Sequence, residues 1–181
     1  MVKLVEKDDE VDGQCYAMKI FKTERMGNAA ETIQHLQKEM EIVHSLNLES
    51  VPRYYEFKED YLIKKTGSTE KREKVFFLVM DYIEGCTLFE FFIKVGRQED
   101  KYLRYIFRQV ALLLHKLHQA GIAHRDIKPE NVMLTENDFG VKLIDLGYGI
   151  SLAGRRKDGF TSTCLGTDMY MAPEILAGKL Y

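Results

Sequence analysis

The chain has 181 residues, of which 45% are hydrophobic and 30% charged, and its formal net charge is −2 at pH 7. These values are typical of a soluble globular protein with enough chain to bury a core, and they argue against a basic surface for nucleic acid or anionic lipid. No apolar run reaches the length of a membrane span, and the N-terminal segment lacks the apolar core of a secretory signal. Because the three cysteines are odd in number and far apart, we expect reduced thiols and a cytoplasmic protein.

The first elements are predicted to form a β-hairpin. Residues 2–6 and 15–21 are rich in β-forming residues, and the polar, glycine-containing segment 7–13 between them is typical of a turn. In the second strand, the side chains of Ala17 and Lys19 share one face because strand residues alternate.

A helix and two more strands are expected next. Apolar residues at helical spacing predict a helix over about 29–46, in which Glu39 flanks the buried stripe. Residues 50–60 and 75–83 are predicted to be strands. The charged segment 64–74, which contains a glycine, is predicted to be an exposed hairpin loop.

The second half of the chain is predicted to be mostly helical. A long helix is expected over 100–119, with Gly121 as its C-terminal cap. Its apolar stripe consists of Ile106, Val110, Leu113, Leu114 and Leu117. The polar segment 123–134 follows, then a β segment over 141–150, and then a loop up to Asp168 and a helix or turn to the end.

Four short motifs follow one another in a characteristic order: YAMK, HRDIKPEN, DLG and MAPE. Together they resemble the signature set of the eukaryotic protein kinases, and the resemblance extends over the whole chain. It implies an α+β, two-lobed fold. Residues 1–82 would form a small antiparallel sheet lobe with one helix, and residues 83–181 an incomplete, mainly helical lobe.

The resemblance implies roles for a set of charged residues. Lys19 would hold the α- and β-phosphates of ATP, while Glu39 would fix the lysine by an ion pair. Asp126 would accept or orient the proton of the substrate hydroxyl, and Lys128 would steady the transferred phosphoryl group. Taken alone, Lys19 could equally be a solvated strand lysine and Glu39 an exposed helix carboxylate.

Metal binding and acceptor type are implied in the same way. Asn131 and Asp145 carry oxygen ligands suited to Mg²⁺, a hard cation that proteins hold with few carboxylates plus phosphates. Lys128, two residues after Asp126, follows the pattern of kinases that act on serine or threonine, and Thr167 supports the same acceptor. We therefore expect ATP, Mg²⁺ and a protein substrate with a serine or threonine hydroxyl, and no nucleic-acid partner.

The adenine base would lie between the lobes, according to the same resemblance. Its pocket would be lined by Val2, Ala17, Met80, Met133 and Ile144. The backbones of Asp81 and Ile83 would form hydrogen bonds with the base. For Met80 and Met133, simple core packing is an alternative interpretation, compatible with the first because such pockets are lined by core-like residues.

Control of activity is expected in the segment before MAPE. Arg125, next to Asp126, marks the kinases whose activation segment is ordered by phosphorylation, and a phosphate on Thr163 would supply charge for an arginine. The hydroxyls at 161 and 162 are alternatives.

The sequence departs from the family pattern in several places. The glycine-rich phosphate loop would end just before Met1, and the chain stops soon after MAPE, so we expect a fragment of a longer kinase. Leu146 replaces the usual phenylalanine of the DLG motif (residues 145–147), which resembles the metal-binding triplet of the family. Asp168 replaces the proline that frequently follows Thr167. These departures leave a second hypothesis open: a non-catalytic, pseudokinase-like regulatory or scaffold module.

Overall fold

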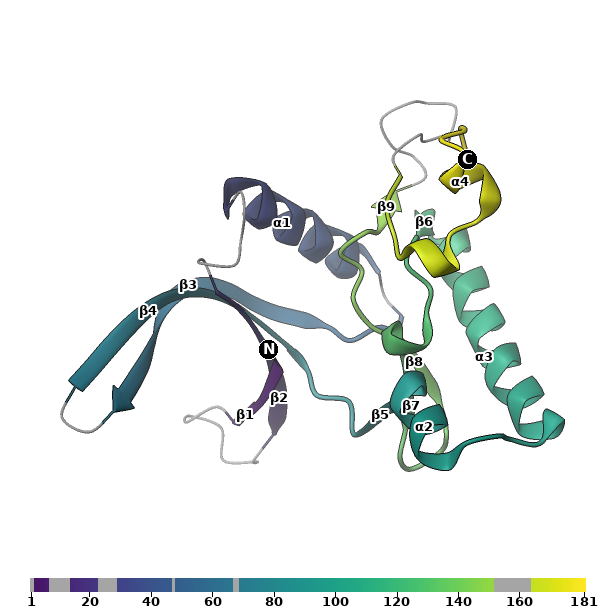
Figure 1. Cartoon of the computed structure of the whole chain (residues 1–181), viewed down its shortest axis with the longest axis horizontal. Helices are drawn as coiled ribbons and strands as arrows, with labels where there is room; N and C mark the ends of the chain where they lie inside the picture. Colours follow the sequence, from purple (N-terminus) through teal and green to yellow (C-terminus); the bar gives the residue numbers. More distant parts are fainter. Residues whose placement is uncertain (1, 7–13, 23–28, 47, 67–68, 152–163) are drawn as a thin grey trace. The chain divides into compact units, whose positions relative to one another are not determined.

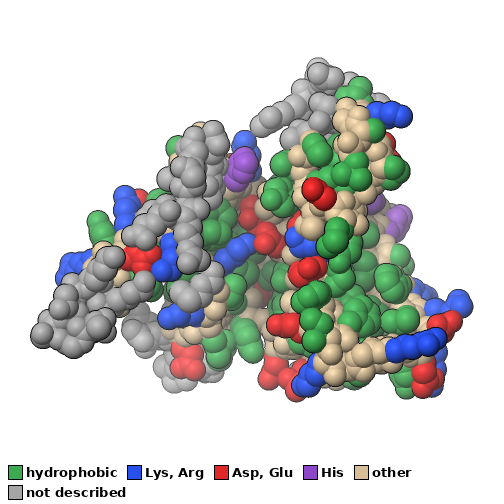
Figure 2. Space-filling view, viewed as in Figure 1, with side chains coloured by type: hydrophobic (Ala, Val, Ile, Leu, Met, Phe, Trp, Pro, Cys, Tyr) green, Lys and Arg blue, Asp and Glu red, His purple; other side chains and the backbone are tan. Residues whose placement is uncertain are grey.

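The computed structural model describes most of the chain, namely residues 2–6, 14–22, 29–46, 48–66, 69–151 and 164–181. These residues form two units. Residues 1–37 with 52–83 make the first, and residues 38–51 with 84–181 make the second. No helix in the described ranges is long and apolar enough to cross a membrane. Figure 2 shows acidic and basic side chains next to one another on the visible face, in keeping with the small net charge.

The first unit contains an antiparallel sheet of four strands in the order β1-β2-β4-β3 (Figure 1). Its strands are β1 (Val2–Glu6), β2 (Cys15–Lys22), β3 (Tyr54–Thr66) and β4 (Thr69–Asp81). The alternation of β2 buries Tyr16 and Ile20 on one face of the sheet, and Leu78 of β4 is only 1% exposed on the other face. The predicted hairpin of the first two strands is confirmed.

The prediction of a loop over 64–74 is wrong, because β3 and β4 continue through the described part of this segment. Within the described residues, strand β2 pairs with β4 as far as Val75, and β3 and β4 continue beyond it as a ribbon paired with each other (Figure 1). Charged residues are compatible with such strands where neighbours neutralise them, and Lys74 Nζ lies 2.8 Å from Glu59 Oε1 across the pair. The high charge of this segment therefore did not indicate its backbone conformation.

Helix α1 (Ala29–Ser45) confirms the helix predicted from the apolar stripe. Leu36 and Val43 are buried, and Glu39 is buried with them at 2% exposure. The first half of α1 belongs to the first unit and the second half to the second. The ion pair of Lys19 with Glu39 joins residues of different units and stays a prediction.

Within the described residues, the second unit combines helices with a sheet in the order β5-β7-β8 and a two-stranded sheet of β6 and β9. Its elements in chain order are β5 (Gly85–Thr87), α2 (Leu88–Val95), α3 (Asp100–Gln119), β6 (Ile122–Ala123), η2 (Pro129–Asn131), β7 (Val132–Thr135), β8 (Val141–Leu143), β9 (Ile150–Ser151), η3 (Asp168–Tyr170) and α4 (Pro173–Leu176). The predicted α+β fold, which combines a small antiparallel sheet with helices, is confirmed.

The long helix predicted after residue 99 is α3, and its apolar stripe is buried as expected. The buried residues are Ile106, Val110, Leu113 and Leu117. Leu114 of the predicted stripe is only half-buried. The helix stops where Gly121 adopts a left-handed φ of 74° and its N–H donates to His118 O at 2.9 Å. Because β6 and β8 both contact α3, this helix positions the polar segment between them.

The β segment predicted over 141–150 is interrupted. β8 ends at Leu143 and β9 begins only at Ile150. Asp145 has a φ of 61°, a left-handed conformation that a strand residue does not adopt. Leu146, at the position of the usual phenylalanine, is 1% exposed and so keeps the apolar packing of that position.

Candidate active site

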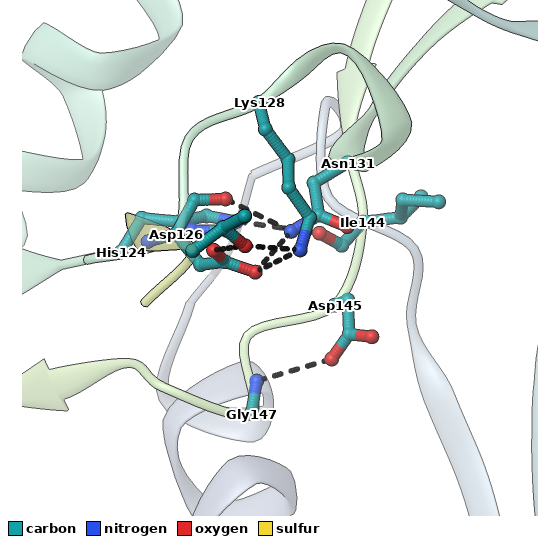
Figure 3. A network of polar contacts seen from close by, with 8 residues as sticks. His124, Asp126, Lys128, Asn131, Ile144, Asp145 and Gly147 are labelled. Carbon is teal, nitrogen blue, oxygen red and sulfur yellow. Dashed lines mark hydrogen bonds and ion pairs between the residues drawn. The ribbon is translucent and has the colours of Figure 1, made fainter. Parts of the chain in front are cut away.

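The loop between β6 and η2 places a carboxylate at the centre of a polar cluster. Asp126 is 6% exposed. Its Oδ2 lies 2.8 Å from Lys128 Nζ and accepts from Asn131 Nδ2 at 2.8 Å, while its Oδ1 accepts from Thr167 Oγ1 at 2.8 Å. Figure 3 shows the side chains of Lys128 and Asn131 pointing at this carboxylate. Four of the residues predicted for the site are therefore brought together.

The electrostatics of this cluster keep Asp126 ionised. Burial alone would raise the pKa of Asp126, but hydrogen bonds from Lys128 and Thr167, the charge of Lys128 and the bond from Asn131 together lower that pKa. The same contact raises the pKa of Lys128, chiefly through its hydrogen bond to Asp126. Lys128 Nζ also donates to Thr167 Oγ1 at 2.7 Å. A low pKa makes Asp126 a weak base in the resting state, better suited to orienting a hydroxyl than to deprotonating it fully.

His124 is buried against the cluster and contacts its backbone. It is 2% exposed, its Nδ1 accepts from Asp126 N–H at 3.3 Å, and its Nε2 lies 3.3 Å from Ile144 O. One nitrogen that accepts and one that donates describe a neutral imidazole. Burial lowers the pKa of His124, and the bond to Ile144 and the nearby carboxylates oppose this only in part. These contacts give His124 a structural role in the cluster.

We expect His124 to make the protein less stable in mild acid. Below about pH 6.5 the unfolded chain protonates this histidine while the folded chain does not, so the free energy of unfolding falls as the pH falls toward the lower folded pKa. Urea unfolding at pH 7.5 and 5.5 measures this loss. His124→Gln keeps a donor and an acceptor without titrating, and should show a smaller loss. His118→Gln, an exposed histidine on α3, is the control, and an unchanged loss in His124→Gln would contradict the prediction.

The DLG triplet, residues 145–147, lies next to this cluster within the same unit. Ile144 N–H donates to Asn131 O at 3.0 Å, which ties the end of β8 to η2. Gly147 N–H donates to Asp145 Oδ1 at 3.4 Å (Figure 3). A Cβ placed on Gly147 would lie 3.4 Å from Glu39 Oε2, so the Glu39 carboxylate is close to the triplet.

The donor set fits Mg²⁺ when phosphate oxygens complete it. Asn131 directs its amide nitrogen to Asp126, so its oxygen is the atom left for a cation, and Asp145 contributes a carboxylate. Among the described residues no group of three or more His, Cys, Asp and Glu could hold a metal. Mg²⁺ typically takes one or two protein carboxylates and substrate phosphates. These residues therefore suit a cation that arrives with a nucleotide.

A pocket of about 200 Å³ lies beside Asp126 and was not predicted from the sequence. Ile127, Tyr170, Met171 and Ile175 line it together with Asp126. The sequence signal that could have indicated this pocket is the group of apolar residues just after Thr167. The Thr167 hydroxyl donates to Asp126 and so holds this segment beside the carboxylate. The pocket can admit a side chain close to the carboxylate.

Arg125 anchors this region to the rest of the second unit. Its φ of 66° is left-handed, its Nε donates to Tyr148 O at 2.7 Å, and its Nη1 lies 3.4 Å from the Tyr181 hydroxyl. Gly166 has a φ of 125°, and a Cβ there would meet Arg125 O at 2.7 Å, so only glycine fits this close approach. Thr163, the predicted phosphorylation site, lies outside the described residues, as do positions 161 and 162.

The nucleotide residues predicted for the first unit gather on one face of its sheet. Cross-strand partners share a face, and the register pairs Val2 with Lys19 and Ala17 with Met80. Because Ala17 and Lys19 alternate onto the same side, all four lie together. Lys19 Nζ is 5.4 Å from the centre of the Phe21 ring.

The other predicted nucleotide residues lie at strand ends. Asp81 closes β4, and Ile83 follows it and is 8% exposed. In the second unit, Met133 of β7 is half-buried opposite Lys142, and Ile144 follows β8.

Comparison with known proteins places these observations in a family. Residues 2–181 match the family model of the protein kinase domain. The chain is 32% identical over 170 residues to serine/threonine-protein kinase cds1 of Schizosaccharomyces pombe, covering 92% of this chain and 34% of the relative. It is 32% identical over 174 residues to maternal embryonic leucine zipper kinase of Xenopus laevis (94% and 24%), and 27% identical over 179 residues to NUAK family SNF1-like kinase 1 of Homo sapiens (99% and 24%). The chain thus spans about a quarter to a third of the length of these relatives.

Proposed function

Because the chain belongs to the protein kinase family, we propose that it transfers the γ-phosphoryl group of ATP to a serine or threonine hydroxyl of a protein. The observation that carries this proposal is the buried Asp126 carboxylate, held ionised by Lys128 and Thr167 beside an open pocket. Phosphoryl transfer depends on positioning and on neutralised charge more than on covalent chemistry. The cluster supplies both.

Each residue of the cluster has a separate role in the proposed transfer. A substrate hydroxyl entering the pocket would donate to Asp126, which orients it and takes its proton as transfer proceeds. Lys128 places a positive charge beside the same carboxylate, where negative charge on the moving phosphoryl group needs compensation. Thr167 holds both side chains, and the relative cds1 carries serine/threonine kinase in its name, which supports the choice of acceptor.

Nucleotide and metal would be held by residues of both units. We assign adenine to Val2, Ala17, Met80, Met133, Ile144 and the backbones of Asp81 and Ile83. Lys19, with Glu39, would bind the phosphates. Asn131 and Asp145 would hold Mg²⁺, which when bound neutralises phosphate charge.

Regulation by phosphorylation is part of the proposal. Arg125 already uses its guanidinium to bind Tyr148 O and the Tyr181 hydroxyl. A phosphate on Thr163 would offer the same group a stronger, charged acceptor. All three cysteines lie in the described parts and form no disulfide bond there, which supports the proposed cytoplasmic location.

None of the described observations favours the alternative, a non-catalytic kinase-like module. In such a module, one or more of the residues expected to be catalytic would be replaced. The sequence has all of them: Lys19, Glu39, Asp126, Asn131 and Asp145.

The test is phosphotransfer by the purified chain. A mixed peptide library with serine, threonine and tyrosine acceptors is incubated with ATP and Mg²⁺, and the phosphorylated residues are identified by mass spectrometry. We expect phosphoserine and phosphothreonine without phosphotyrosine. Transfer to tyrosine would contradict the acceptor assignment. Nucleotide binding without any transfer would favour the non-catalytic module.

A further inference from the structure

The edge strand of the first sheet contains a bulge at Tyr55. In the register of β3 with β4, Tyr54 pairs with Met80 and Glu56 pairs with Val79, so Tyr55 is an extra residue between two regular pairs. A bulge of this kind redirects the side chain of the extra residue and is common beside functional sites. Here it stands next to the end of β4.

The redirected side chain of Tyr55 contacts the Asp81 carboxylate, which accepts two hydrogen bonds. Tyr55 donates its hydroxyl to Asp81 Oδ1 at 2.5 Å, and Arg53 N–H donates to Asp81 Oδ2 at 2.8 Å. Asp81 N–H in turn donates to Arg53 O at 3.0 Å. Tyr16, the cross-strand partner of Asp81 on β2, packs edge-on against the Tyr55 ring, with ring centres 5.2 Å apart. The end of β4 is thereby fixed from both neighbouring strands.

We propose that Tyr55 is a positioning residue for nucleotide binding: through the Asp81 carboxylate it fixes the backbone of residues 81–83 in the conformation that receives adenine. The inference rests on the proposed function, which assigns adenine to the backbones of Asp81 and Ile83. It gives the Asp81 side chain a role distinct from that of its backbone. Tyr55 itself does not touch the nucleotide in this account.

The hydroxyl is suited to act as a permanent donor. The hydrogen bond to Asp81, followed by burial and the charge of Asp81, raises the pKa of Tyr55 to about 12. The hydroxyl therefore stays protonated, and able to donate, throughout the physiological pH range.

A purely structural role for this bond is the competing explanation. Tyr55 is 47% exposed, and a hydrogen bond at the surface contributes little to global stability because water replaces it. Its effect should instead be local, on the two residues after Asp81, where the chain has left the sheet. Local order at a binding segment lowers the ordering cost of the ligand.

The test compares Tyr55→Phe with the unsubstituted chain. We expect the Kd for a non-hydrolysable ATP analogue with Mg²⁺, measured by titration calorimetry, to rise about threefold to tenfold. The KM for ATP should rise similarly, with a much smaller change in kcat. Amide hydrogen exchange at Tyr82 and Ile83 should become faster, while exchange in the rest of β4 stays the same.

Two further variants sharpen the comparison. Tyr61→Phe removes a hydroxyl from a similarly exposed tyrosine of the same strand and should leave affinity and exchange unchanged. Asp81→Asn removes the charged acceptor and should weaken binding in the same way. The double variant Tyr55→Phe with Asp81→Asn should lose little more than Asp81→Asn alone, because the two side chains act through one bond.

The outcomes separate this inference from the proposed function. If the unsubstituted chain binds the analogue and Tyr55→Phe binds it equally well, the positioning role is overturned while the proposed function stands. Faster exchange throughout the first unit with a lower melting temperature would show a structural role, and would also overturn it. If the unsubstituted chain binds no nucleotide, both the positioning role of Tyr55 and the proposed function are contradicted.

Discussion

Replacing Asp126 with asparagine should lower kcat for peptide phosphorylation by about 10²- to 10⁴-fold, the range for loss of a positioned general base. Asparagine matches the shape of the carboxylate but cannot take the proton of the substrate hydroxyl. The affinity for nucleotide should change little, since the proposed role of Asp126 concerns the acceptor. Initial rates at saturating ATP and peptide, with nucleotide binding measured separately, check both expectations.

The control for this variant is Asp100→Asn at the start of α3. Asp100 has a side chain that is 87% exposed and lies 4.0 Å from Arg104, so its charge contributes little. It should leave the rate unchanged. An Asp126→Asn protein that keeps roughly a tenth or more of the activity would rule out the assigned role.

Removing the Asp145 charge should abolish the stabilisation of the chain by ATP with Mg²⁺. A ligand at about 100 times its Kd raises the free energy of unfolding by about 2.7 kcal/mol. For a chain of this size, this raises the melting temperature by roughly 5–10 °C. Asp145→Asn suits this test because asparagine, unlike most residues, accepts the left-handed φ of 61°. The neutral amide is a much poorer ligand for a hard cation.

Thermal unfolding with ATP alone, with ATP and Mg²⁺, and with EDTA distinguishes the possibilities for Asp145. The unsubstituted chain and Asp100→Asn should show the magnesium-dependent rise, and EDTA should remove it. Asp145→Asn should melt at nearly the same temperature under all three conditions. A full magnesium-dependent rise in Asp145→Asn would mean that the cation is bound elsewhere.

Periodic segments were predictable from the sequence because their burial follows directly from spacing. The hairpin of β1 and β2, helix α1 and the buried stripe of α3 depend on which residues recur on one face. The central cluster was predictable for a different reason: Asp126, Lys128 and Asn131 belong to the HRDIKPEN motif, and the resemblance of that motif to the protein kinases assigned them to one site.

The errors arise where tertiary context decides the backbone. A charged segment reads as a loop whether it is irregular or a strand paired across a ribbon, so 64–74 could not be assigned from composition. The interruption after β8 depends on the left-handed Asp145, which an otherwise β-rich segment does not reveal. The bulge at Tyr55 and the pocket at Tyr170 depend on register and on a loop returning to Asp126, and neither is local information.

The ribbon formed by β3 and β4 beyond Val75 divides the first sheet into two regions of different local stability. Up to Val75, β4 is paired with both β2 and β3, whereas beyond Val75 the described strands pair it with β3 alone. A two-stranded hairpin alone is marginally stable in water, so we expect the described strand pairs of the ribbon to open more readily than the rest of the sheet. Opening of the ribbon would stop short of Asp81, because residues 75–80 of β4, which pair with both β2 and β3, lie between the ribbon and Asp81. The chain can therefore vary the length or sequence of the ribbon in evolution without disturbing the segment to which we assign adenine.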